Sequence, residues 1–127
     1  MEGINYDVKS GIEILEKKSK SKIKEIYVSG GGAKSDIVCQ LAADIYGIPV
    51  IITNNNENGT IGAAMAGFVG LKIYRDLFEA REKMVSKIKK FTPNYEKNKK
   101  YEYIYNNIYI KIYKKLKPFY KKMYSIQ

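Results

Sequence analysis

Two residue types that often carry chemistry are missing or nearly missing from this 127-residue sequence. It contains no histidine and one cysteine, Cys39. The lack of histidine removes the most frequent general acid or base, and one cysteine does not build a usual zinc site. A lone cysteine also excludes an intrachain disulfide. This composition fits a reducing compartment, so we expect a cytoplasmic protein.

Long hydrophobic runs are also missing. The longest apolar stretches, residues 48–52 and 61–69, are far shorter than the roughly 20 residues that span a bilayer. The first residues, MEGINYD, do not show the basic and then apolar segments of a secretory signal. We therefore expect no membrane partner. The length allows one domain with a hydrophobic core and is too short for two typical ones.

Arginine is scarce in a chain that is otherwise strongly basic. The formal net charge is +10, from 23 basic and 13 acidic residues, and only Arg75 and Arg81 are arginine. Specific recognition of bases and phosphates favours arginine, whose planar group binds in a bidentate manner. Residues 95–127 hold nine Lys and two Glu, so most of the excess charge lies in one segment. We interpret that segment as a solvated basic face and do not expect nucleic acid as a partner.

Hydrophobic periodicity predicts an alternation of helices and strands. We expect strands at 23–29 and 50–53, and helices at 4–18, 33–46, 59–70, most of 71–90, and 95–127. Gly47 is a candidate helix C-cap, and Pro118 is expected to bend the last helix. The order of these elements predicts an α/β unit with two neighbouring parallel strands. Two strands make a thin sheet, so we expect something to be missing at one edge.

The segment with the clearest chemical signal is a glycine turn, Gly30-Gly31-Gly32, between a strand and a helix. Glycines let the backbone turn tightly and approach a ligand, and the free N–H groups of the following helix face the turn. This geometry suits an anion or the polar edge of a nucleotide. The pattern is neither G-x-G-x-x-G nor a P-loop. On this pattern alone, a glycine-rich connection without a ligand remains an alternative.

Residues 26–50 resemble the adenosine-binding motif of the FGGY-type carbohydrate kinases, which belong to the actin and hexokinase superfamily. The family pattern is a strand, then GGGA-[KR]-S, then a helix with Q-x-x-A-D-x-x-G-x-P-V. The matching residues here are Gly30 to Ser35, Gln40, Ala43, Asp44, Gly47, Pro49 and Val50. Further along, Glu57 followed by residues 60–64 resembles the Glu and A-L-G-A-A helix of the family. The last segment resembles the C-terminus of xylulose-kinase-like members, so the resemblance covers essentially the whole chain.

The resemblance implies a fold and a site. The fold would be α/β, the C-terminal part of an actin/hexokinase-like (ribonuclease H-like) ATPase domain. Residues 1–127 would form one incomplete domain, ending in a Lys/Tyr-rich helix at 95–127. Gly31, Gly32 and Ala33 would lie against the adenosine and α-phosphate of ATP or ADP, and Asp36 near the adenine or ribose. Ser35 is expected to cap the helix. Gln40 and Asp44 are expected on the helix surface or behind the site, and not on the ligand.

Two parts of such kinases are absent from the sequence. One is the D-x-G-[ST] hairpin that holds phosphates and Mg²⁺, and the other is the catalytic Asp that deprotonates the sugar hydroxyl. The four aspartates, Asp7, Asp36, Asp44 and Asp76, lie in no matching motif. We therefore expect no catalytic and no metal-binding residue in this chain, with Mg²⁺ bound only in the complete kinase.

Phosphoryl transfer would then need the missing N-terminal kinase portion. The expected protein partner of the chain is that portion or a second copy of the chain. The GGGAKS form resembles xylulose kinases more than glycerol kinases, so a xylulose-like pentulose is the expected sugar. Two other functions stay open. One is a noncatalytic nucleotide-binding or regulatory module, and the other is an interaction protein whose basic helix binds nucleic acid or an acidic membrane surface.

Overall fold

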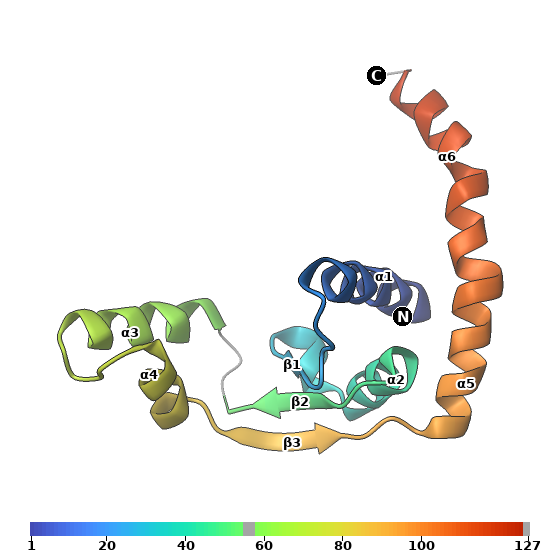
Figure 1. The fold of residues 1–127 in the computed structure, drawn as a ribbon. Helices are drawn as coiled ribbons and strands as arrows, with labels where there is room; N and C mark the ends of the chain where they lie inside the picture. Colours follow the sequence, from blue (N-terminus) through green and yellow to red (C-terminus); the bar gives the residue numbers. More distant parts are fainter. Residues whose placement is uncertain (55–57, 126–127) are drawn as a thin grey trace.

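The computed structural model describes residues 1–54 and 58–125, and Glu57 lies outside these ranges. The helices lie above a small sheet or to its sides in Figure 1, and two parts of the chain extend away from it. In chain order the elements are α1 (Glu2–Ser19), β1 (Ile26–Val28), the 3-10 turn η1 (Gly31–Lys34), α2 (Asp36–Tyr46), β2 (Val50–Thr53), α3 (Asn58–Gly70), α4 (Leu77–Met84), β3 (Lys87–Phe91), α5 (Tyr95–Ile104), the π-helical turn η2 (Tyr105–Tyr109) and α6 (Ile110–Tyr124).

The sheet has three strands in the order β1-β2-β3. β1 and β2 are parallel, with Ile26 opposite Val50, which confirms the predicted pair of neighbouring parallel strands. β3 joins the other edge of β2 in the antiparallel direction, with Phe91 opposite Val50. Figure 1 shows β3 as the outer strand of this sheet.

The predicted helix over residues 71–90 is wrong at both ends. α4 covers only Leu77–Met84, and β3 takes up Lys87–Phe91. The start of α4 is set locally, because the side chain of Asp76 accepts a hydrogen bond from the Glu79 N–H at 2.9 Å. The strand is set by a distant partner, since the edge of β2 offers backbone hydrogen bonds that a continued helix would leave unmade.

α2 lies between the sheet and two other helices. On one side Cys39, Ala42 and Ala43 pack with Val50 and Phe91 of the sheet, and the small side chains of α2 allow close approach. On its other side, Ile45 of α2 forms a second cluster with two tyrosines, Tyr6 of α1 and Tyr105 of η2. Ile45 and Val50 have no exposed surface, and burying such a side chain contributes about 1.5–3 kcal/mol.

The two ends of α2 follow local rules. The predicted capping role of Ser35 is confirmed, because its hydroxyl accepts a hydrogen bond from the Val38 N–H at 3.5 Å. The helix therefore begins at Asp36, three residues later than predicted, and Ala33 lies in η1 instead. Gly47 ends the helix with φ of 66°, and its N–H donates to the Ala43 carbonyl at 2.9 Å, as predicted for a C-cap.

Two charged side chains are buried where α2 meets its neighbours. Asp44 was expected on the helix surface or behind the site, and it is only 2% exposed. Its carboxylate accepts hydrogen bonds from the Gln40 side chain and from the Asn94 N–H, both at 2.8 Å. Lys9 of α1 donates to the Ile45 carbonyl at 3.0 Å and pairs with Glu102 of α5. These contacts connect α1 and α2 to both ends of α5.

The long C-terminal helix is confirmed, with an interruption that the sequence did not predict. η2, a π-helical turn, separates α5 from α6. Pro118 lies inside α6, and the ribbon of α6 changes direction toward the C-terminus (Figure 1). The main contacts of α6 are with the adjoining η2. Among the described residues, no helix is long and apolar enough to cross a membrane.

Candidate nucleotide site at the glycine turn

The glycine turn lies at the carboxyl end of β1, beside the carboxyl end of the parallel strand β2. In open α/β sheets this edge is where ligands commonly bind. Gly30 has φ of 83°, a left-handed conformation that favours glycine. Its carbonyl accepts a hydrogen bond from the Ala33 N–H at 3.2 Å, and the Gly32 carbonyl accepts one from the Ser35 N–H at 3.3 Å. The turn is therefore held by its own backbone.

The structure brings the predicted site residues together around this turn. Gly31 and Gly32 are exposed, Asp36 is exposed in the first turn of α2, and Ala33 is buried. A side chain at Gly31 or Gly32 would meet nothing within 4 Å. The packing of this chain therefore does not require glycine at either position. The two glycines leave the backbone open to approach from outside.

Ala33 and Cys39 form the inner wall of the turn. The Cys39 thiol lies 3.8 Å from both the Gly32 and the Ala33 carbonyl oxygens, within reach of a weak S–H hydrogen bond. Burial raises the pKa of this thiol, which keeps it protonated and unreactive. Cys39 therefore supports the turn from inside and is not a candidate nucleophile.

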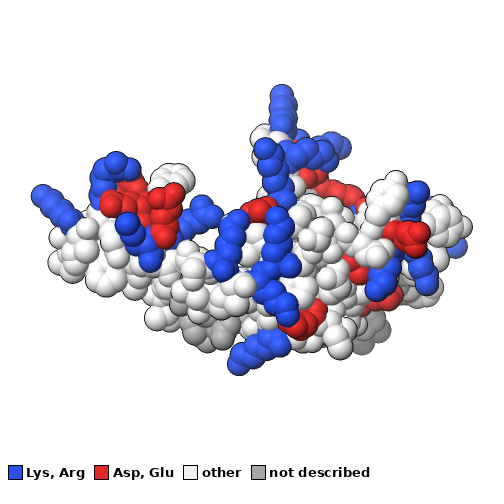
Figure 2. Space-filling view, turned by 90° about the horizontal axis from the view of Figure 1, so that it is seen from below, with Lys and Arg blue, Asp and Glu red and all other residues white. Residues whose placement is uncertain are grey.

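Asp36 has a partner that sequence reasoning missed. Its carboxylate forms an ion pair with Lys89 of β3, and both side chains are about half exposed. Lys89 was placed in a helix because the segment was read as helical, whereas in the sheet it lies opposite Ile52. The segment KIKKF does not alternate apolar and polar residues, so no local signal identified it as a strand. Figure 2 looks onto this side of the molecule, where Lys and Arg side chains stand out across the middle of the face.

Two cavities lie near the segments on either side of the glycine turn in the sequence, and neither is lined by the three glycines. One, of about 540 Å³, lies at the carboxyl ends of β1 and β2 and is lined mostly by apolar groups, with Arg81 at its edge. The Arg81 guanidinium lies 5.6 Å from the centre of the Tyr27 ring. The other, of about 570 Å³, lies along α2 and is lined by Asp36, Gln40 and Tyr101 among others. Of the predicted site residues, Asp36 lines one of these two cavities, and Gly31, Gly32 and Ala33 line neither.

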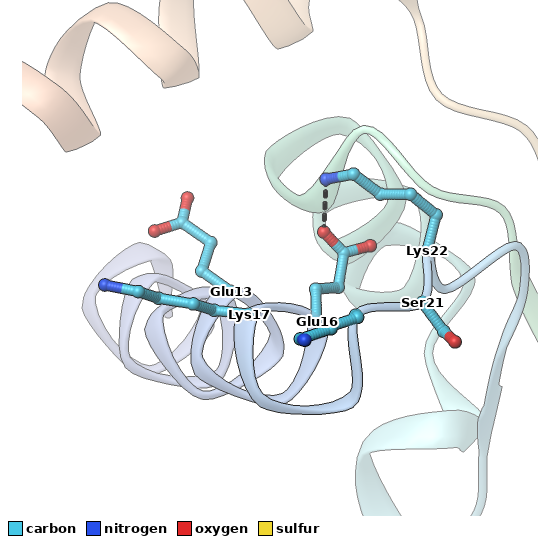
Figure 3. Close-up of a pocket in the computed structure, with 6 residues that line it drawn as sticks. Glu13, Glu16, Lys17, Ser21 and Lys22 are labelled. Atoms are coloured by element: carbon cyan, nitrogen blue, oxygen red, sulfur yellow. Dashed lines mark hydrogen bonds and ion pairs between the residues drawn. The ribbon is translucent and has the colours of Figure 1, made fainter.

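A third hollow, of about 450 Å³, lies at the end of α1, away from the glycine turn (Figure 3). Two of its charged groups, Glu16 and Lys22, are paired with each other. The Glu16 carboxylate accepts hydrogen bonds from the Lys22 ammonium at 2.5 Å and from the Ile23 N–H at 2.8 Å, and both lower the pKa of Glu16. These contacts fasten α1 to the segment that leads into β1, which is a structural role.

The site residues suit a nucleotide better than a metal ion. The turn offers open backbone and the N-terminal end of α2, which favours negative charge. Within residues 1–54 and 58–125, no group of three His, Cys, Asp or Glu side chains is placed to hold a metal ion.

Comparisons with known proteins agree with this fold and turn. A family model described as the FGGY family of carbohydrate kinases, C-terminal domain, matches residues 1–71. The chain is 36% identical to glycerol kinase 2 of Saccharolobus solfataricus over 79% of its own length and 20% of that protein. It is 33% identical to the xylulose kinase of Bacillus subtilis over 86% of its own length and 22% of that protein.

Solved structures give the same result. The ligand-bound xylulose kinase of Lactobacillus acidophilus matches 81% of this chain with a TM-score of 0.75 and 28% identity. The xylulose kinase of Rhodospirillum rubrum matches 94% with a TM-score of 0.79 and 22% identity, a likeness in fold. The chain spans about a fifth of the length of the curated relatives that it matches. The α/β arrangement is thus that of part of a kinase domain, and the chain belongs to the FGGY family of carbohydrate kinases, within their C-terminal domain.

Proposed function

We propose that this chain is the adenosine-binding part of an ATP-dependent sugar kinase, which transfers a phosphoryl group from ATP to a hydroxyl of a xylulose-like pentulose. The observation that carries the proposal is the glycine turn in a chain of this family. It follows a parallel strand, it leaves the backbone at Gly31 and Gly32 open, and a helix begins directly after it. The relatives include both xylulose kinases and glycerol kinases, so the choice of a pentulose rests on the GGGAKS form of the turn.

In this proposal each residue of the turn has a defined task. The backbone of Gly31, Gly32 and Ala33 lies against the adenosine and α-phosphate. The N-terminal end of α2 supplies N–H groups and a partial positive charge for that phosphate. The Asp36 carboxylate accepts hydrogen bonds from the ribose hydroxyls or the adenine amino group. ATP or ADP would bind here, and Mg²⁺ would be held by groups outside this chain.

We further propose that the chain transfers no phosphoryl group alone and works with the remaining kinase portion. The motifs for phosphate binding and proton abstraction are not in its sequence. Such transfer needs both substrates enclosed and aligned between two lobes. The chain also exposes large apolar side chains that a partner would cover, such as Ile37 at 81% and Phe78 at 78% exposure.

Titration of the full chain with ADP in a calorimeter tests nucleotide binding. We expect the parent chain to bind ADP and Gly32→Arg to lose binding, because the large side chain would fill the approach to the turn. Gly11→Arg is the matched control, since Gly11 is exposed on α1 and a side chain there meets nothing within 4 Å. No ADP binding by a well-folded chain, or equal binding by Gly32→Arg, would overturn the assignment of adenosine to this turn.

One observation favours a second candidate, an interaction function of the C-terminal helix. α6 carries six Lys, and Ile112, Leu116, Phe119 and Met123 recur at the spacing of one helix face. A basic amphipathic helix of this kind is typical of contact with an anionic partner. Binding to nucleic acid or to anionic vesicles that falls steeply as the salt concentration rises would support this candidate.

A further inference from the structure

Lys89 is the lysine of β3 that reaches the N-terminal end of α2, directly after the glycine turn. The strand has three lysines, and two of them pair with Glu25, ahead of β1: Lys87 at 2.8 Å and Lys90 at 3.4 Å. Lys89 instead pairs with Asp36, in the first turn of α2. Two features fix its direction: its place opposite Ile52 in the sheet, and the position of its ammonium 5.2 Å from the centre of the buried Phe91 ring.

The charge of Asp36 conflicts with the proposed ligand. A carboxylate in the first turn of a helix interacts favourably with the positive helix end, and it takes up the place that an anionic ligand would otherwise occupy. It also repels the phosphates of a nucleotide, because like charges repel at short range. A neighbouring ammonium removes this repulsion. Lys89 supplies that ammonium from another element of the fold.

We propose that Lys89 is a specificity-determining residue of the nucleotide site. By pairing with Asp36 it neutralises the carboxylate beside the turn and removes the repulsion of the nucleotide's phosphates. The pairing therefore strengthens the binding of an anionic adenine nucleotide and leaves the binding of an uncharged nucleoside unchanged. The inference rests on the proposed binding of adenosine at this turn. It assigns a role to the strand β3, whose residues the glycine motif does not include.

The experiment compares the dissociation constants of ADP and adenosine for the full chain and three variants. Lys89→Gln should weaken ADP binding by about fivefold, the upper end expected for an exposed ion pair, and should leave adenosine binding within about twofold. Lys90→Gln is the matched control, because Lys90 is the next residue and pairs with Glu25. It should change neither constant by more than about twofold.

The double variant Asp36→Asn with Lys89→Gln separates neutralisation from a structural role. If Lys89 acts by cancelling the charge of Asp36, removing both charges should return the ratio of the ADP and adenosine constants toward the parent value. The effect of Lys89→Gln should also shrink as salt is added, because exposed charges are screened. Should Lys89→Gln fail to fold, Asp36→Asn alone is informative, since loss of the carboxylate charge should raise the preference for ADP.

Three results would overturn the inference. Equal weakening of ADP and adenosine by Lys89→Gln would show that Lys89 only supports the fold. Unchanged ADP binding in Lys89→Gln, with the parent chain binding ADP, would remove Lys89 from the site and leave the proposed function standing. A parent chain that binds no ADP would overturn the proposed function together with this inference.

Discussion

At the scale of single residues, Tyr6 combines a well-packed ring with an unsatisfied polar end. Its side chain is 4% exposed, and its ring centre lies 5.2 Å from that of Tyr109 and 5.9 Å from that of Tyr105. Its hydroxyl has no hydrogen-bond partner among the residues that the structure describes. Burial raises the pKa of this hydroxyl to about 12, with a smaller contribution from the negative charge of Glu2.

We predict that Tyr6→Phe keeps or raises stability at neutral pH, by up to about 1 kcal/mol, because it removes a buried donor without a partner. In the parent chain the pKa of the Tyr6 hydroxyl is higher in the folded state than the unfolded value of 10. The folded state therefore keeps its full stability below pH 10, where the hydroxyl is neutral, and loses stability as the pH rises toward 12. Urea unfolding at pH 7 and pH 11 should show a smaller alkaline loss in Tyr6→Phe. Tyr103→Phe, at an exposed position, is the control. An equal alkaline loss in Tyr6→Phe and the parent would contradict the prediction.

Residues also differ in how far the sequence could predict them. Gly31, Gly32 and Ala33 could be proposed as site residues from the sequence because they belong to one continuous motif, and Asp36 because it directly follows the GGGAKS part of that motif. Asp44 belongs to the same motif, but its burial depends on the Asn94 N–H, which is 50 residues away in the chain. A contact at that separation leaves no local pattern, and the same reason hid the pairing of Asp36 with Lys89.

At the scale of elements, boundaries set by local caps were predictable and those set by distant partners were not. Ser35 and Gly47 fix the two ends of α2 with bonds inside a few residues. β3 forms only because β2 lies beside it, and its sequence, KIKKF, has little strand character on its own. The two parallel strands were predicted because they are rich in Ile and Val. β3 also precedes a turn signal, at Pro93 and Asn94, but it holds three lysines and was read as the end of a helix.

The end of α2 gives a prediction at this scale. Gly47→Ala should destabilise the fold by about 1–3 kcal/mol, because φ of 66° is strained for alanine and the new Cβ would lie 2.9 Å from the Asn98 side chain. Gly11→Ala, inside α1 with open space around it, should instead stabilise by up to about 1 kcal/mol. Thermal unfolding followed by circular dichroism measures both. A Gly47→Ala chain as stable as its parent would show that the helix end tolerates a side chain.

At the scale of the whole molecule, the fold has one side that is well packed and others that are open. α2 has neighbours on two sides, whereas α3 and α4 contact mainly each other, to one side of the sheet (Figure 1). The relatives that share this fold are about five times as long as the matched part of this chain. The open surfaces are therefore the places where we expect the remaining kinase portion to bind.

A complementation experiment tests that expectation. The Bacillus subtilis xylulose kinase without its last fifth would be produced separately and mixed with this chain, ATP, Mg²⁺ and xylulose. We expect phosphorylation only in the mixture, because each part lacks groups that the other supplies. The mixture with Gly32→Arg is the control and should be inactive. Activity of this chain alone would contradict its proposed dependence on a partner, and an inactive mixture of two folded parts that bind each other would remove the proposed kinase role.

The π-helical turn η2 also fixes the rotational phase of the last helix. A π-turn holds one residue more than an α-helical turn, and each residue of an α-helix advances the chain by about 100° around the axis. Tyr105 and Tyr109, at the two ends of η2, are held by Tyr6 of α1. In the described part of the chain the main contacts of α6 are with η2, so this extra residue decides which way the lysines and the apolar residues of α6 face. Loss of one residue from the turn would rotate α6 by about 100° and exchange much of one face for the other.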